Sequence, residues 1–298
     1  MEKIKVQNVK TSLSKHGFMQ APVVEMDELN NLFFELTNKC CNLKCTHCYI
    51  KRNPFKKEKD FLPIEKIKQT LILSKRSELK SVYLTGGEPM MHPDFNSILR
   101  MCLKVSNVTI LTNGTFINDK KARFLRKIDD ESDYETIYRI SFEHFDEHKN
   151  DQIRGRGSFR KALMAVQNLF KYDFNPIITV TSYYKEPRDK IFEGFYELCK
   201  KFGFEIGKIN LKITPYFDPN PLNYRQLETN EFDPNLLDCK NSRIISNKGM
   251  FSCPALCNDF RARSGYGIEN CSKKIYLDTE KCFNCVLHKA KAFSNDWM

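Results

Sequence analysis

Three cysteines stand within a stretch of eight residues near the start of the chain. Cys41, Cys45 and Cys48 follow an apolar run at residues 32–36, which predicts a short buried strand. Thiolates gathered this closely repel one another unless a cation lies between them, and thiolate ligands select zinc or iron–sulfur clusters over magnesium or calcium. A tetrahedral zinc ion needs a fourth ligand, for which His47 is available. Zinc sites usually match one cysteine pair with a distant second pair, so three cysteines in one loop favour an iron–sulfur cluster.

The C-x3-C-x2-C spacing of this loop, placed directly after a first strand, resembles the signature of the radical S-adenosylmethionine (SAM) superfamily. The resemblance implies that Cys41, Cys45 and Cys48 hold a [4Fe–4S] cluster and leave one iron open for SAM. In that family an electron from the cluster cleaves SAM to a 5′-deoxyadenosyl radical, which abstracts a hydrogen atom from the substrate. We therefore expect an enzyme whose cofactors are SAM and a [4Fe–4S] cluster bound by three cysteines.

The composition limits the compartment and the partners. The 298 residues are enough for a large α/β domain with an appendage. Twelve cysteines without an apolar signal segment predict metal ligation in a reducing, cytoplasmic environment rather than disulfides. No stretch approaches about 20 consecutive apolar residues, so we expect no membrane span. The formal net charge of +11 suits an acidic peptide, a nucleic acid or a phosphorylated metabolite, and equally a solvated surface.

From residue 31 onward the predicted strands and helices alternate, which is typical of a parallel sheet built from βαβ units. We predict strands at residues 32–36, 81–84, 108–111, 136–142, 177–180 and 209–213, and helices at residues 63–75, 96–103, 159–170 and 191–201. Six repeats resemble the open barrel of the radical SAM family. The expected fold is therefore α/β, a partial (β/α)6 TIM-like barrel with a small C-terminal twitch-type Fe–S domain. The expected divisions are an N-terminal arm (1–30), the radical SAM partial barrel (31–215) and a twitch-like auxiliary cluster domain (216–298).

The turn after the second predicted strand carries Gly86, Gly87, Glu88 and Pro89. Paired glycines let the backbone approach a ligand closely, because no Cβ intervenes. The turn resembles the GGEP element of the family, which meets the amino group of SAM. By that resemblance Glu88 accepts hydrogen bonds from the SAM ammonium group and the glycines supply backbone contacts. Taken alone, the same residues form an ordinary turn.

Residues at later strand ends resemble further SAM contacts of the family. Asn113 belongs to a Thr-Asn-Gly element that shapes the SAM pocket, and it is equally an ordinary Asn-Gly turn. Ser141 and Glu143 resemble the Ile-Ser-Leu-Asp element that holds the ribose, with Glu in place of Asp. Arg154 resembles the arginine that binds the SAM carboxylate, for which a guanidinium fork is well suited. Two residues beside the third cysteine are expected to add adenine or backbone contacts: His47 and Tyr49.

Cysteines are dense again near the other end of the chain, at Cys239, Cys253, Cys257, Cys271, Cys282 and Cys285. Residues 244–251 predict a hairpin that turns at residues 247–249 and brings its flanking cysteines to one end. The region resembles the SPASM/twitch auxiliary domain of radical SAM enzymes. By that resemblance it holds one auxiliary [4Fe–4S] cluster on four ligands: Cys239, Cys253, Cys282 and Cys285. A zinc ribbon is the alternative. Cys257 and Cys271 remain as replacement ligands or as donors of a hydrogen atom to a substrate radical.

These resemblances predict a radical SAM enzyme that matures a ribosomal peptide by crosslinking, oxidation or epimerisation. The expected partners are an acidic peptide or small-molecule substrate and an electron donor such as flavodoxin or ferredoxin, with no membrane and no nucleic acid. The alternative is radical oxidation or rearrangement of a small metabolite such as a sugar or nucleotide, held by basic residues such as Arg188 or Lys212. A zinc-stabilised nucleic-acid-binding module is a third interpretation, but it does not explain residues 86–89 or Arg154.

Overall fold

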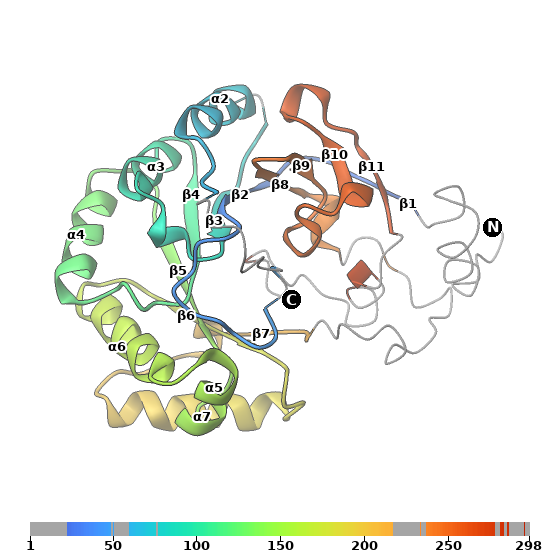
Figure 1. Ribbon diagram of the computed structural model, residues 1–298. Coiled ribbons are helices and arrows are strands. Elements are labelled where there is room, and N and C mark those ends of the chain that lie inside the picture. The colour runs from blue at the N-terminus through green and yellow to red at the C-terminus, as the bar shows by residue number, and fades with distance from the viewer. Residues whose placement is uncertain are drawn as a thin grey trace.

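Six parallel strands form the centre of the molecule. The computed structural model describes residues 23–48, 50, 60–75, 77–216, 233, 237–277, 281, 282, 285 and 295. The parallel strands are β2 (Asn31–Thr37), β3 (Ser81–Gly86), β4 (Asn107–Thr112), β5 (Thr136–Phe142), β6 (Ile177–Thr181) and β7 (Leu211–Thr214). They lie in sequence order and curve into an open barrel with helices on the outside (Figure 1). The predicted partial (β/α)6 barrel is confirmed.

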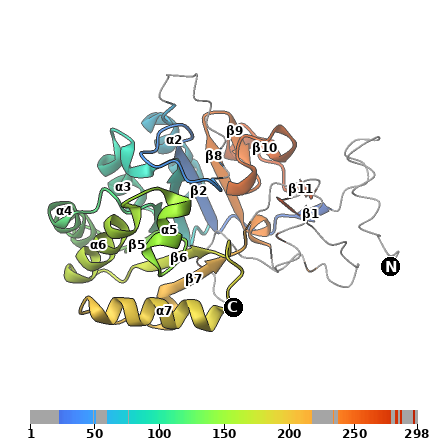
Figure 2. The same cartoon turned by 60° about the horizontal axis from the view of Figure 1, so that its bottom comes forward.

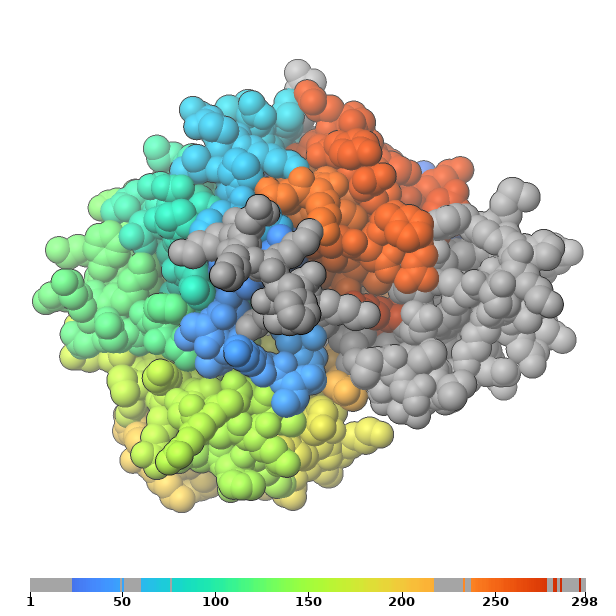
Figure 3. Space-filling model, viewed as in Figure 1, coloured from blue at the N-terminus to red at the C-terminus, as the bar shows by residue number. Residues whose placement is uncertain are grey.

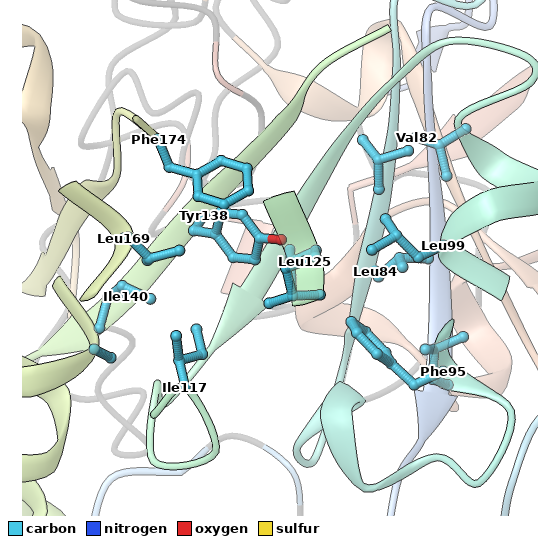
Figure 4. Close-up of a cluster of buried hydrophobic side chains, with 14 of the residues drawn as sticks. Val82, Leu84, Phe95, Leu99, Ile117, Leu125, Tyr138, Ile140, Leu169 and Phe174 are labelled. Atoms are coloured by element: carbon cyan, nitrogen blue, oxygen red, sulfur yellow. The ribbon is translucent and has the colours of Figure 1, made fainter. Parts of the chain in front are cut away.

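The outer helices are α2 (Ile64–Ser74), α3 (Phe95–Cys102), α4 (Asp119–Asp130), α5 (Glu147–Arg154), α6 (Ser158–Lys171) and α7 (Arg188–Lys201). Their apolar faces pack on the outer face of the strands and form the main core, part of which Figure 4 shows. Helices α4 and α5 are absent from the sequence prediction because both are rich in charge. Each begins at a good N-cap, since the side chains of Asn118 and Asp146 accept hydrogen bonds from the backbone N–H groups of Lys121 and Lys149.

Alternate residues of each strand face opposite sides of the sheet. On β2, Leu32, Phe34 and Leu36 belong to the core under the helices. Phe33 belongs to a separate apolar cluster on the inner side, with Tyr83 of β3. The parallel register pairs Phe33 with Tyr83 and then Glu35 with Thr85, so polar side chains follow the apolar ones toward the carboxyl ends of the strands, inside the barrel.

The carboxyl-terminal segment extends the barrel sheet past β2. Strand β8 (Ser242–Ser246) pairs in parallel with β2, and β9 (Gly249–Phe251) and β10 (Arg263–Gly265) continue the sheet in antiparallel fashion. The hairpin between β8 and β9 turns where the sequence predicts. Figure 2 shows β8 beside β2. The pairing of β8 with β2 was not predicted, because β8 follows β7 in the chain by a long connection.

Two short strands form a second, two-stranded sheet. Strand β1 (Val23–Glu25) pairs with β11 (Lys274–Tyr276) in antiparallel fashion. The described end of the expected N-terminal arm is therefore held by the carboxyl-terminal segment. In the described part of the chain no helix is both long and apolar enough to cross a membrane.

Candidate active site

A cavity of about 210 Å³ opens at the carboxyl ends of the parallel strands. It brings together most of the residues that the sequence singled out, namely Cys41, Cys45, His47, Cys48, Gly86, Gly87, Asn113, Ser141 and Arg154. In the space-filling view the blue segment that contains the cysteine loop lies between the green barrel helices and the orange carboxyl-terminal elements (Figure 3). Tyr49 lies outside the described residues.

The cysteine loop after β2 is held by hydrogen bonds from its neighbours. Asn113 donates from Nδ2 to Asn42 Oδ1 at 2.9 Å and, more weakly, to Cys41 Sγ at 3.8 Å. Burial raises the pKa of Cys45, the Arg154 guanidinium lowers it, and the thiols of Cys48 and Cys41 raise it again. A cation among these sulfurs would offset both the burial of the Cys45 thiolate and its repulsion by the neighbouring thiolates, so the three cysteines fit an iron–sulfur cluster. Among the described residues no three Cys, His, Asp or Glu side chains already converge on one point as a single metal ion would require.

The two glycines after β3 serve the cysteine loop. A Cβ at Gly86 would lie 2.2 Å from Thr37 O, and a Cβ at Gly87 would lie 2.3 Å from Cys40 O. Glu88 N donates to Cys40 O at 2.8 Å. The close approach that glycine permits here is therefore between two segments of the protein, while both glycines also line the cavity.

Glu88, which the sequence predicted to accept hydrogen bonds from SAM, lies behind the cavity wall. Glu88 is fully buried and does not line the cavity. Its carboxylate accepts hydrogen bonds from Thr112 Oγ1 at 2.7 Å, Asn113 N at 2.9 Å and Met90 N at 3.1 Å. Burial raises the pKa of this carboxyl group. Glu88 instead links the end of β3 to the end of β4, and the buried Pro89 begins the short 3-10 helix (Pro89–Met91) that follows.

Arg154 and Glu143 form a buried ion pair at the rim of the cavity. Arg154 donates from Nη1 to Glu143 Oε1 at 2.9 Å. His47 Nε2 lies 2.7 Å from the same oxygen but is not aligned as a hydrogen bond. The other oxygen, Glu143 Oε2, is buried and has no hydrogen-bond partner among the described residues. An unpartnered buried carboxylate oxygen costs free energy, so it marks a place where a ligand hydroxyl fits.

The sequence reasoning missed polar residues on the inner face of the later strands. Arg139 and Thr179 line the cavity, and Arg139 donates from Nε to Thr179 Oγ1 at 3.2 Å. Lys212, which the sequence analysis did name, pairs in register with Thr179 and is buried on the same side. The alternation of side chains along a strand could have identified Arg139, because it precedes Ser141 by two residues on β5 and therefore faces the same side. Arg188, in contrast, lies at the start of α7 on the outside.

A second, smaller cavity of about 30 Å³ lies beside the two-stranded sheet. The four cysteines expected to be auxiliary ligands line it together: Cys239, Cys253, Cys282 and Cys285. Burial and, to a smaller extent, the Cys282 thiol together raise the pKa of Cys253 to about 12. Thiols that titrate against one another in an apolar cavity fit a shared cationic centre.

Arg243 stabilises the wall of this second cavity. Its side chain is fully buried and donates to the carbonyl oxygens of Cys239 at 2.9 Å, Ser242 at 2.7 Å and Ser272 at 3.1 Å. Burial raises the pKa of the Cys239 thiol well above its ordinary value, the Cys253 and Cys282 thiols raise it further, and the Arg243 guanidinium partly offsets the rise. A buried positive charge beside four thiols fits an anionic thiolate cluster better than it fits neutral thiols.

The radical SAM superfamily matches residues 36–199 of this sequence. That range spans both the cysteine loop and the cavity residues up to Arg154, and it covers more than half of the 298 residues. The chain belongs to the radical SAM superfamily. The predicted family and the prediction of an enzyme are confirmed.

Three curated relatives of this radical SAM protein each match it over 44–46% of its length. AlbA, the antilisterial bacteriocin subtilosin biosynthesis protein of Bacillus subtilis, is 33% identical over 46% of this chain and 29% of AlbA. The mycofactocin maturase MftC of Mycobacterium tuberculosis is 33% identical over 46% of this chain and 34% of MftC. The S-adenosylmethionine-dependent nucleotide dehydratase RSAD2 of Oncorhynchus mykiss is 35% identical over 44% of this chain and 36% of RSAD2. The chain thus spans about a third of the length of these relatives.

Solved structures share the fold at low sequence identity. anSMEcpe with bound AdoMet and the Cp18Cys peptide has a TM-score of 0.57 at 18% identity, over 79% of this chain and 76% of that one. Streptococcus suis SuiB bound to its precursor peptide SuiA also has a TM-score of 0.57, at 15% identity, over 87% of this chain and 65% of SuiB. These likenesses show the fold of the radical SAM protein.

The two left-over cysteines lie in different surroundings. Cys257 packs against the inner apolar cluster of the barrel, together with Leu111 of the cavity wall. Cys271 lies in a groove with Leu29 and Glu78, which precede β2 and β3. That groove is at the amino ends of the strands, away from the cavity. Cys271, expected as a replacement ligand or hydrogen-atom donor, therefore lies away from the cavity, whereas Cys257 lies beside Leu111 of its wall.

Proposed function

We propose that this radical SAM enzyme reductively cleaves SAM at a [4Fe–4S] cluster on Cys41, Cys45 and Cys48 and modifies a ribosomal peptide. The observation that carries the proposal is the shared cavity. The three cysteines, Arg154 and Ser141 come from separate elements, and all of them line one space at the carboxyl ends of the strands. When bound, the cluster and SAM supply a deoxyadenosyl radical that abstracts a hydrogen atom from unactivated carbon.

The chain's own residues would bind and orient SAM. Arg154, fixed by Glu143, offers its guanidinium to the SAM carboxylate, because a charge-assisted hydrogen bond there is stronger than one to a neutral group. The unpartnered Glu143 Oε2 would accept a ribose hydroxyl, with Ser141 beside it on β5. Asn113 would keep Cys41 in place through the amide contact to its sulfur. Glu88 would hold the ends of β3 and β4 together behind the cavity and would contact no ligand.

We also assign one auxiliary [4Fe–4S] cluster to Cys239, Cys253, Cys282 and Cys285. Its support is the common cavity of the four thiols and the buried Arg243 at its wall. A second cluster would accept an electron from a substrate radical, so the net reaction would be an oxidation or a crosslink. Transfer of a hydrogen atom from Cys257 to that radical would instead give epimerisation.

A ribosomal peptide is the favoured substrate because AlbA is named for the biosynthesis of a bacteriocin, MftC is named a maturase and SuiB has been seen with a precursor peptide. An acidic peptide suits the net charge of +11. A nucleotide is the second candidate, favoured by the relative RSAD2 and by the buried cations Arg139 and Lys212 on the inner face of the strands. The electron donor would be a flavodoxin or ferredoxin.

Anaerobic reconstitution with iron and sulfide tests the proposal. We expect about eight irons per chain and 5′-deoxyadenosine after reduction with dithionite in the presence of SAM. Cys45→Ser should lose about four irons and all deoxyadenosine, and Cys253→Ser should lose about four irons and keep the first cluster. Cys271→Ser is the matched control and should keep both. Deoxyadenosine formation by Cys45→Ser would overturn the assignment of the first cluster.

A further inference from the structure

Two positively charged side chains lie beside the four cysteines of the small cavity. Arg243 comes from β8, and its side chain is fully buried behind the cavity wall. Lys281 lines the cavity and directly precedes Cys282, which is one of the four cysteines. Neither Arg243 nor Lys281 lines the large cavity, so their charges are not part of the SAM site.

Arg243 is hydrogen-bonded to neutral groups. Its guanidinium donates to the backbone carbonyl oxygens of Cys239, Ser242, Ser272 and Lys273, and to no carboxylate among the described residues. Its Nε–H is buried and has no hydrogen-bond partner in the described part of the chain. A buried charge is costly unless an opposite charge lies near it. An anionic cluster on the four thiolates would provide that opposite charge.

Lys281 is anchored to a different part of the cavity wall. Its Nζ donates to the carbonyl oxygen of Ala255 at 2.6 Å, and both residues line the cavity. Ala255 belongs to the 3-10 helix Pro254–Leu256, which begins directly after Cys253. The ammonium group is therefore held between two segments that each carry a cysteine of the cavity, Cys253 and Cys282.

Both positive charges act on the sulfurs of the cavity. Burial raises the pKa of the Cys239 thiol, and the Arg243 guanidinium partly offsets the rise. Burial likewise raises the pKa of the Cys253 thiol, and the Lys281 ammonium partly offsets that rise. The carboxylate of Asp238, which also lines the cavity, acts in the opposite direction on Cys239. The two cations therefore favour negative charge on these sulfurs, and one carboxylate of the described wall opposes them.

The first cysteine site differs, because its cation is already paired. Arg154 Nη1 lies 2.9 Å from Glu143 Oε1, so this buried ion pair adds little net charge there. Around the small cavity, Arg243 and Lys281 together exceed the carboxylate of Asp238 and leave an excess of positive charge. The apolar part of the cavity wall, which screens charges weakly, consists of Leu237, Leu256, Ile275 and Leu277. The reduction potential of an iron–sulfur cluster depends on such surrounding charges, since reduction makes the cluster more negative.

We propose that Arg243 and Lys281 raise the reduction potential of the auxiliary cluster, so that it takes up an electron more readily than a buried site without these charges. This inference rests on the proposed function, which assigns one [4Fe–4S] cluster to the four cysteines. The two residues act through the cluster by their charge and contact no substrate. Reduction adds one electron and one negative charge to the cluster, and the attraction to both cations increases with that charge. A higher potential favours the electron-accepting role that the proposed function gives to this cluster.

The test is a redox titration, followed by electron paramagnetic resonance, of the reconstituted full chain that carries Cys45→Ser and so should keep only the auxiliary cluster. Adding Lys281→Met should make reduction about tenfold less favourable, which lowers the potential of this one-electron couple by about 59 mV. Lys281→Arg keeps the charge and should keep the potential, whereas Lys281→Glu should lower it further than Lys281→Met. Lys248→Met is the matched control, because it neutralises an exposed lysine in the turn between β8 and β9, and it should not change the potential.

Arg243→Met tests the second charge in the same background. It should lower the potential at least as much as Lys281→Met, because a fully buried charge is screened less by solvent and salt. High salt should accordingly reduce the effect of Lys281→Met more than that of Arg243→Met. Iron is counted in every sample, so that potentials are compared between intact clusters. If Arg243→Met loses its iron, the three Lys281 variants decide the question by themselves.

The outcomes separate this inference from the proposed function. If the Cys45→Ser protein holds no iron, or keeps its iron when Cys253→Ser is added, the auxiliary cluster is wrongly assigned and the inference falls with it. If the cluster is intact and Lys281→Met leaves its potential unchanged, the inference alone is overturned. Equal shifts in Lys281→Met and Lys281→Arg would show that the shape of the side chain matters rather than its charge, and would overturn the inference as well.

Discussion

Gly87→Ala should damage the first cysteine site through a single methyl group. The new Cβ would lie 2.3 Å from Cys40 O, and the next contact, to the Cys40 carbonyl carbon, would be 2.9 Å. Ordinary contact begins at 3.4 Å, so the end of β3 and the cysteine loop must separate by about 1 Å. Both atoms belong to the backbone, so no flexible side chain can move aside.

The cost follows from that separation. Overpacking of this kind destabilises by about 1–3 kcal/mol. The backbone bonds from Gly87 N to Thr37 O and from Glu88 N to Cys40 O would also lengthen, at about 1 kcal/mol each. We therefore expect the free energy of unfolding to fall by about 3–5 kcal/mol. Because Cys41 moves with Cys40, reconstituted protein should also hold fewer irons, with the loss confined to the first cluster.

Urea unfolding and iron counting on the same preparations measure both effects. Gly207→Ala is the matched control, because a Cβ there meets nothing closer than 3.8 Å. That variant should keep its iron and should not lose stability. If Gly87→Ala unfolds at the same urea concentration as wild type and retains its iron, the glycine is not needed for the approach of β3 to the cysteine loop.

Three further predictions concern the supports of the two sites. Arg243→Ala removes hydrogen bonds to two segments of backbone, so it should lower the free energy of unfolding by about 3 kcal/mol or more and release auxiliary iron. Arg261→Ala, a half-exposed control beside Asp259, should cost under about 1 kcal/mol, and equal losses in both variants would refute this account. Asn113→Ala should speed the loss of iron from the first cluster severalfold when a chelator is added. The control Asn118→Ala removes only the N-cap of α4, so it should lower the free energy of unfolding by about 1 kcal/mol and keep the iron. Equal rates of iron loss in the two variants would contradict the role of Asn113. The Lys149 ammonium holds the pKa of Glu186 at about 2, below its ordinary value of 4.5. The ion pair therefore stabilises the folded protein fully above pH 4.5, and this stabilisation is lost as the pH falls toward 2. The difference in unfolding free energy between wild type and Glu186→Gln should shrink across that window, and a constant difference would count against this ion pair.

Strand positions were predictable because buried parallel strands are continuous apolar runs. Residues 136–142 were placed as a strand and form β5 at the same bounds. The cavity was predictable for a similar reason: strand ends in a parallel sheet meet at one edge, so Ser141 and Asn113 come together without any knowledge of their contacts. Spacing alone thus indicates which residues share an edge of the sheet.

The direction of a side chain at a strand end was not predictable from spacing. Glu88 follows two glycines whose backbone freedom permits several paths, and Gly86 takes a φ of +124°. That turn directs the Glu88 carboxylate under β4, toward Thr112 and the Asn113 N–H, rather than into the cavity. The contact of Asn258 with Glu35 was equally hidden, because the two residues are more than 200 positions apart and are brought together by the pairing of β8 with β2.

That strand pairing also fixes how far apart the two cysteine groups lie. Phe33 of β2 is level with Ile244 of β8, which is level with Phe251 of β9. Since β9 runs antiparallel, Cys253 lies beyond Phe251 toward the amino end of β2, whereas Cys41 lies beyond its carboxyl end. At about 3.3 Å per residue along β2, the two groups are roughly 20 Å apart along the sheet. Asn258 is hydrogen-bonded to Glu35 of β2 and to Ser246 of β8, so the chain turns back after Cys253 toward the barrel strands. The segment from Cys253 to Cys257 therefore connects the small cavity to the inner apolar cluster of the barrel, which includes Leu111 of the large cavity's wall.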